Sequence, residues 1–76
     1  MDEPEILVDA RGHRCPVPTL KLQKQMHAMA EGESVILIAD DPMAQIDVPH
    51  FCNQNGYRLQ SVGPCGTGWR FLILRP

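Results

Sequence analysis

A run of four consecutive apolar residues at positions 35–38 constrains the fold more than any other feature of the chain. The run is short, and its apolar side chains fall on both faces of an extended backbone. This pattern is typical of a strand in the interior of a sheet, which we predict at 34–39. A chain of 76 residues buries only about 60% of its unfolded surface, so the core around this strand is thin and has no room for a large internal pocket.

Further strands and helices are predicted on either side of this run. The predicted strands are 5–10, 34–39, 57–62 and 69–74, and the predicted helices are about 16–29 and 48–55. Pro16 suits the first position of the first helix, with Cys15 as its N-cap. Asp47 is predicted to cap the second helix, and Gly56 to end it. The glycine-rich segment 63–68 is predicted as the loop between the last two strands.

The order of these elements, β-α-β-α-β-β, predicts an α+β fold. A helical crossover makes the first two strands parallel, and the short connection makes the last two an antiparallel hairpin. Two helices cannot cover both faces of a four-stranded sheet. We therefore expect a two-layer α/β sandwich with a mixed sheet and both helices on one face, forming a single domain over residues 1–76 and a monomer.

Composition narrows the possible functions. The net charge of −2 gives no general attraction to nucleic acid, so no direct nucleic-acid binding is expected. No apolar stretch approaches the roughly 20 residues that a membrane span needs, and the first four residues are acidic where a signal peptide is basic. We expect a cytoplasmic protein with no membrane contact. The three cysteines have neither disulfide-framework nor zinc-like spacing, so neither a metal nor another cofactor is predicted.

Helical periodicity separates two faces of the first helix. The apolar stripe that should face the core consists of Leu22, Met26 and Met29, with Pro18 and Thr19 at its edges. The opposite side carries Val17, Leu20, Lys21, Lys24 and Ala28. Exposed apolar residues and lysines close to Cys15 predict a surface on which a partner protein could dock, although isolated apolar residues are also common on surfaces.

Cys15 is the predicted reactive residue. A cysteine at a helix N-terminus beside a cation, here Arg14, has its thiolate favoured by the helix dipole and by the positive charge. Pro16 and Pro18 have no N–H to offer the sulfur, which leaves the Val17 amide as the available donor. So short a chain leaves little room for a substrate cleft or a poised general base. A reactive thiolate with no pocket suggests that Cys15 reacts with groups on other proteins rather than with a small substrate in an enzyme pocket.

The remaining candidate residues have simpler interpretations. Cys52 lies at helical spacing with other apolar residues and is predicted to be buried in the core. Cys65 is predicted to be exposed in the glycine-rich loop, either as an incidental thiol or as a resolving partner for Cys15. Asp41 is explained by capping before a proline, and Asp40 is interpreted as a solvated loop residue or a partner contact.

Three motifs in order resemble the TusA/SirA family of sulfur carriers over about residues 7–74. They are Asp9-x-x-Gly12-x-x-Cys15-Pro16-x-Pro18, Asp40-Asp41-Pro42 and Asp47-x-Pro49-x-x-Cys52. The resemblance implies the same β-α-β-α-β-β fold. It also implies that Cys15 accepts sulfur as a persulfide from a cysteine desulfurase or a rhodanese-like donor and relays it to an acceptor protein. Cys65 and His13 depart from the family pattern.

The resemblance implies several possible pathways. We expect tRNA 2-thiouridine formation, with molybdenum-cofactor biosynthesis or sulfur oxidation as alternatives. Two other classes of function stay open. One is a non-catalytic regulatory interaction module in which Cys15 is merely structural, and the other is a redox thiol protein that uses Cys15 together with Cys65.

Overall fold

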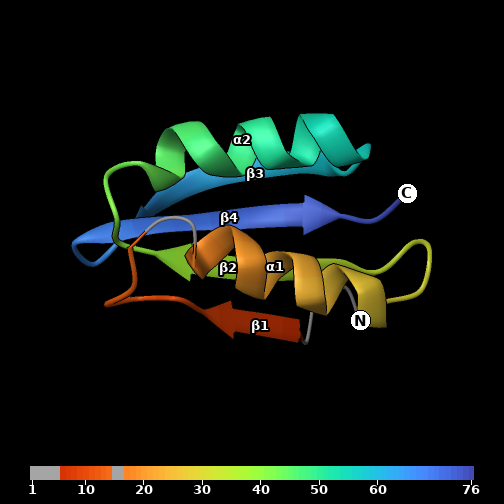
Figure 1. The fold of residues 1–76 in the computed structure, drawn as a ribbon, viewed down its shortest axis with the longest axis horizontal. Coiled ribbons are helices and arrows are strands. Elements are labelled where there is room, and N and C mark those ends of the chain that lie inside the picture. Colours follow the sequence, from red (N-terminus) through yellow and green to blue (C-terminus); the bar gives the residue numbers. More distant parts are fainter. Residues whose placement is uncertain (1–5, 15–16) are drawn as a thin grey trace.

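The computed structural model describes residues 6–14 and 17–76, and its elements follow the predicted order (Figure 1). They are β1 (Ile6–Asp9), α1 (Val17–Ala28), β2 (Ser34–Ala39), α2 (Ala44–Asn55), β3 (Arg58–Cys65) and β4 (Gly68–Leu74). The predicted N-cap Cys15 and first helical residue Pro16 lie outside the described residues. The rest of α1 and the whole of β2 match their predicted positions.

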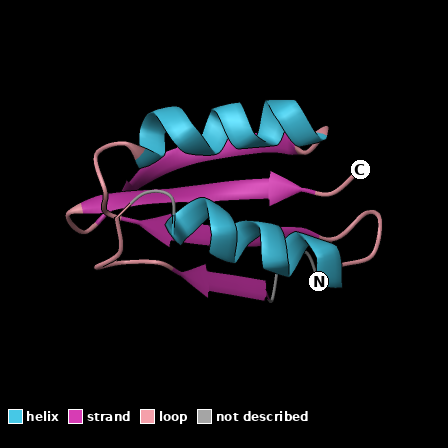
Figure 2. Ribbon diagram, viewed as in Figure 1, coloured by secondary structure: helices cyan, strands magenta, loops and turns pink. Residues whose placement is uncertain are grey.

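The four strands form one mixed sheet in the order β1-β2-β4-β3 (Figure 2). β1 pairs with β2 in parallel, and β4 pairs antiparallel with both β2 and β3. Both helices lie in front of this sheet in Figure 1. The two-layer α+β sandwich predicted from the sequence is confirmed.

The core lies between the helices and one face of the sheet. β2 contributes Val35, Leu37 and Ala39, all with no exposed surface, whereas Ile36 and Ile38 on its other face are only half-buried. The expectation that β2 is an interior strand is therefore correct, but its two faces are not equally buried. The reason is that both helices lie on one face, which leaves no second layer over the other.

The second helix begins earlier than predicted. α2 starts at Ala44 with Met43 as its N-cap, so Asp47 lies in the first turn and does not cap the helix. The Met43 amide donates to Oδ1 of Asp41 (3.2 Å), and the Ala44 amide donates to the Asp41 carbonyl (2.9 Å). This turn starts the helix directly after Pro42. The predicted end of the helix at Gly56 is confirmed.

The hairpin between β3 and β4 is tighter than predicted. β3 continues through Gly63, Pro64 and Cys65, and β4 starts at Gly68, so the turn consists of two residues. The loop predicted over 63–68 from its turn-forming composition is therefore wrong for residues 63–65 and for Gly68, which belong to the two strands. A proline is compatible with β3 because β3 is an edge strand, where one side of the backbone needs no ladder hydrogen bond.

Arg75 anchors the far end of α1. Its Nη1 atom donates to the carbonyls of Met26 (2.6 Å) and Met29 (2.5 Å), and its amide donates to the Glu33 carbonyl (2.9 Å). A cation at a helix C-terminus satisfies carbonyls that have no partner within the helix and interacts favourably with the helix dipole. With this end tied to the segment after β4, the position of α1 on the sheet is fixed.

Candidate functional site

Several connections meet at one end of the sheet, on the left of Figure 1. Because β1 and β2 are parallel, the loop after β1 (10–14) and the loop after β2 (40–43) leave from the same edge. The β3–β4 turn arrives there too, since Ala39 at the end of β2 pairs with Trp69 near the start of β4. The described part of α1 also begins at this end. The segment that bears Cys15 joins the first of these loops to α1.

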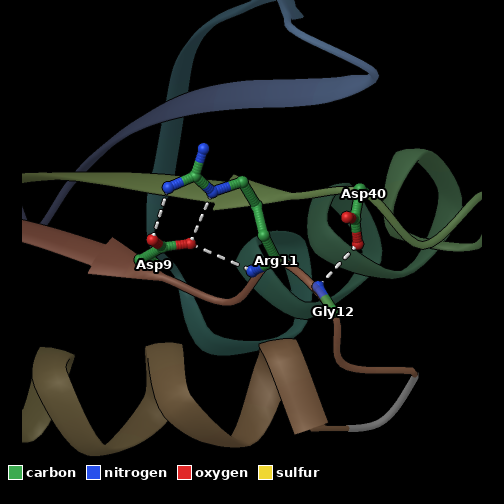
Figure 3. Close-up of polar contacts among 4 residues, drawn as sticks. All are labelled: Asp9, Arg11, Gly12 and Asp40. Carbon is green, nitrogen blue, oxygen red and sulfur yellow. Dashed lines mark hydrogen bonds and ion pairs between the residues drawn. The ribbon is translucent and has the colours of Figure 1, made fainter.

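Asp9 and Arg11 form a clamp at the beginning of the 10–14 loop (Figure 3). Oδ1 of Asp9 accepts hydrogen bonds from the Arg11 amide (3.1 Å) and from Nε of Arg11 (2.9 Å), and Oδ2 accepts one from Nη2 (2.7 Å). These bonds lower the pKa of Asp9 from 3.8 to about 2, and the same side-chain bonding raises the pKa of Arg11. The clamp holds the backbone at the point where the chain leaves β1.

Asp40 holds the next residue of the same loop. Its Oδ1 atom accepts a hydrogen bond from the Gly12 amide (2.9 Å), across 28 positions of sequence (Figure 3). Gly12 has φ 83, which a residue with a Cβ rarely adopts. We interpreted Asp40 from the sequence as a solvated residue or a partner contact. The structure shows a half-buried side chain that ties the ends of β1 and β2 together.

Gly68 brings the hairpin against Asp40. A Cβ placed on Gly68 would lie 2.7 Å from the Cα atom of Asp40 and in collision with the Ala39 carbonyl oxygen. Such an approach between two backbones is possible only without a side chain. Gly68, Asp40 and Gly12 thus form a continuous support from β4 to the loop that precedes Cys15.

The residues beside Cys15 are described, although Cys15 and Pro16 themselves are not. Arg14 is exposed, Pro18 is buried and Val17 is half-buried. The Val17 amide donates to the Arg14 carbonyl (2.9 Å). Our expectation that this amide would be available to the Cys15 sulfur is therefore wrong, because a neighbouring carbonyl already accepts its hydrogen. The roles predicted for Arg14, Pro16 and Pro18 stay predictions.

The predicted faces of α1 agree with the observed burial. Leu22 and Met26 have no exposed surface, whereas Leu20 is 55% exposed and both Lys21 and Lys24 are exposed. Val17 differs, since it is partly covered. The structure thus presents Leu20, Lys21 and Lys24 together on the outer side of the helix, within two turns of its described start.

The two other cysteines differ in their surroundings. Cys52 is 2% exposed in the core, as predicted, and this burial raises the pKa of its thiol to about 11. Cys65 is half-buried at the end of β3. Cys65 pairs with Gly68, which packs against Asp40, so Cys65 lies at the same end of the sheet as the 10–14 loop. Only Cys65 of these two is therefore positioned to influence the candidate site.

The described part of the chain contains neither a group of side chains suited to a metal ion nor a helix suited to a membrane. Among residues 6–14 and 17–76, no three His, Cys, Asp or Glu side chains are grouped to hold a metal ion. No helix in those ranges is long and apolar enough to span a membrane.

Sequence reasoning missed the two carboxylate supports, Asp9 and Asp40. Each lies at the end of a strand, and the two strands are adjacent and parallel. Since the carboxyl ends of parallel strands meet at one edge, that signal was present in the predicted β-α-β order. This order places both aspartates beside the 10–14 loop, where their carboxylates can accept hydrogen bonds from its backbone.

The Asp9–Arg11 clamp predicts a specific pH dependence. The Asp9 pKa is lower in the fold than its ordinary value, so the clamp stabilises the fold above pH 3.8 and loses this effect as pH falls toward 2. In a carboxyl-carbon NMR titration, Asp9 should titrate with a midpoint near 2. Arg11→Gln should return the midpoint toward 3.8, and Arg58→Gln at the start of β3 should leave it unchanged. An unchanged midpoint in Arg11→Gln would show that the clamp does not form in solution.

The described residues form a small two-layer α+β sandwich in which the loop that precedes Cys15 is braced at the carboxyl ends of the parallel strands. A crystal structure of a SirA-like protein from Desulfitobacterium hafniense has the same fold, with a TM-score of 0.80 and 21% sequence identity. The similarity covers 91% of this chain and 95% of that one.

The sequence profile of the family described as Sulfurtransferase TusA matches residues 6–75. The chain therefore belongs to the TusA sulfurtransferase family, and its role is that of a sulfur carrier. Proteins of this family relay sulfur between protein partners.

Proposed function

We propose that Cys15 carries the sulfur as a persulfide. The observation that best supports this is the support of the loop before Cys15 by Asp9 and Asp40 on an otherwise exposed surface. The segment is held at Gly12 before Cys15, and Val17 is bonded to Arg14 across it. A cysteine in a segment that is anchored on both sides, next to the exposed Arg14, suits exchange with a large protein partner better than catalysis on a small molecule.

The proposed reaction is a single thiol–persulfide exchange. The Cys15 thiolate attacks the outer sulfur of a persulfide on the donor protein, which is a cysteine desulfurase or a rhodanese-like protein. The donor's S–S bond breaks, its own cysteine leaves as a thiolate, and a new S–S bond forms on Cys15. In the second transfer, a thiolate of the acceptor protein attacks the outer sulfur of the Cys15 persulfide, and Cys15 leaves as a thiolate. No oxidant or cofactor is consumed.

The pathway that we propose first is tRNA 2-thiouridine formation in the cytoplasm, with the carrier acting as a monomer. A reducing compartment suits this chemistry because it keeps the thiols of the carrier and the acceptor free. Molybdenum-cofactor biosynthesis and sulfur oxidation would use the same step with different acceptors.

The experiment that tests the function is loading by a cysteine desulfurase supplied with cysteine. Intact-mass measurement should show a gain of one sulfur atom, lost on treatment with a reductant. If the protein never gains sulfur, the carrier function is wrong, and the alternative of a non-catalytic regulatory interaction module takes its place. An intramolecular Cys15–Cys65 disulfide, found by peptide mapping in high yield after mild oxidation, would favour the redox function.

We further propose that the donor docks on the surface formed by Leu20, Lys21 and Lys24. Leu20→Glu should slow loading by the donor protein about tenfold, because it places a charge in an apolar contact. The free energy of unfolding should change by less than about 0.5 kcal/mol, since the side chain is largely exposed. His27→Glu, an exposed change at the other end of α1, is the control and should load normally. Normal loading by Leu20→Glu would remove this surface from the interface.

A further inference from the structure

A groove runs along the outer side of the sandwich, between β1 and α1. Its volume is about 380 Å³, and the residues that line it are Leu7, Val8, Asp9, Lys21, Lys24, Gln25 and Ala28. It opens to solvent beside β1, which forms one edge of the sheet (Figure 1). One end of the groove reaches Asp9, where the 10–14 loop begins. An occupant of the groove would therefore reach the start of the loop that precedes Cys15.

Among residues 6–14 and 17–76, no strand pairs with β1 on the side away from β2. The Ala10 amide donates to the Ile38 carbonyl (2.8 Å), and alternate residues of a parallel strand direct their N–H and C=O groups to the same neighbour. Leu7 and Asp9 therefore direct theirs away from β2, toward the open edge. An additional strand can bind such an edge through main-chain hydrogen bonds.

The side chains around the groove specify the sequence of an added strand. Residues on its helix side would face Lys21 and Lys24, which are exposed and form no ion pair with any of the described residues, so acidic residues fit there. Residues on its other side would lie beside Leu7, which is 58% exposed on the face of the sheet that no helix covers. Because side chains of a strand alternate between faces, the fitting pattern is acidic and apolar residues in alternation.

We propose that this groove binds an extended segment of the sulfur donor, in which acidic and apolar residues alternate, as a fifth strand beside β1. The inference rests on the proposed function, because it names what the carrier recognises in its donor. A second copy of the chain does not fit. Two-fold pairing of β1 with itself would bring Lys21 and Lys24 of one copy close to the lysines of the other.

Charge variants test the groove against a cysteine desulfurase as donor. Lys21→Glu with Lys24→Glu should slow donor loading of Cys15 at least about tenfold at low salt, and added salt should bring the parent protein toward the rate of the variant. Lys21→Arg with Lys24→Arg keeps the charges and should load normally. Arg58→Glu reverses an exposed charge on the opposite edge strand and should also load normally.

Hydrogen exchange of the carrier in complex with the cysteine desulfurase tests for the added strand. The amides of Leu7 and Asp9 should exchange more slowly when the donor is bound. Loading of the Lys→Glu variant from inorganic polysulfide should match the parent, which separates failed docking from a failed thiol. A parent that loads from the desulfurase while β1 gains no protection would overturn the inference and leave the carrier function intact. Protection that appears with self-association, in the absence of donor, would overturn it as well.

Discussion

Gly68→Ala should lower the free energy of unfolding by roughly 3 kcal/mol, although it adds a single methyl group. The new Cβ would collide with the Ala39 carbonyl oxygen and lie 2.7 Å from Cα of Asp40, and both contacts are with backbone atoms that cannot rotate away. Either β4 or the end of β2 must shift. For a domain of this size, the expected fall in melting temperature exceeds about 10 °C.

Gly63→Ala is the matched control for this prediction. Gly63 lies in the other strand of the same hairpin, and a Cβ there would meet nothing within 4 Å. Its free energy of unfolding should therefore stay within about 0.5 kcal/mol of the parent, or rise slightly. Equal stability of the two variants, measured by urea unfolding, would contradict the close backbone approach at Gly68.

The same pair of variants reports on the site. Displacing Asp40 in Gly68→Ala should weaken its hydrogen bond to the Gly12 amide, so this amide should exchange faster under native conditions. Gly63→Ala should not have this effect. The contrast would link the hairpin to the loop that precedes Cys15.

Local patterns were sufficient for the framework of the fold. The apolar run 35–38 located β2, and the spacing of Leu22 and Met26 gave the phase of α1, because burial on one side imposes a period on the sequence. The parallel pairing of β1 with β2 and the antiparallel hairpin of β3 and β4 followed from the connections between these strands. The antiparallel pairing of β2 with β4 was not predicted.

The errors arose where distant or competing contacts decide the structure. The start of α2 depends on a turn closed by Asp41, which begins the helix before the expected cap at Asp47. Pro64 lies in a strand because β3 is at the edge of the sheet, and edge position is a property of the whole topology. The bond from Gly12 to Asp40 joins residues 28 positions apart, so no local pattern contains it.

Cys15→Ser should abolish sulfur carriage completely, because a hydroxyl group cannot form a persulfide. Ser replaces a thiol by a group of similar size and leaves Asp9, Arg11 and Asp40 in place, so the fold should be retained. Cys52 does not substitute, since burial holds its thiol protonated with a pKa of about 11. Cys65 would replace Cys15 as the carrier only if it accepted sulfur itself. In that case a Cys65→Ser variant would lose carried sulfur.

Cyanide treatment of the loaded protein, after removal of the donor, measures the carried sulfur most directly. Cyanide takes the outer sulfur of a persulfide as thiocyanate and returns the cysteine as a thiolate. The parent, Cys52→Ser and Cys65→Ser should each release one equivalent of thiocyanate per chain, and Cys15→Ser should release none. Thiocyanate from Cys15→Ser in the same amount as from the parent would contradict the assignment of Cys15 as the carrier.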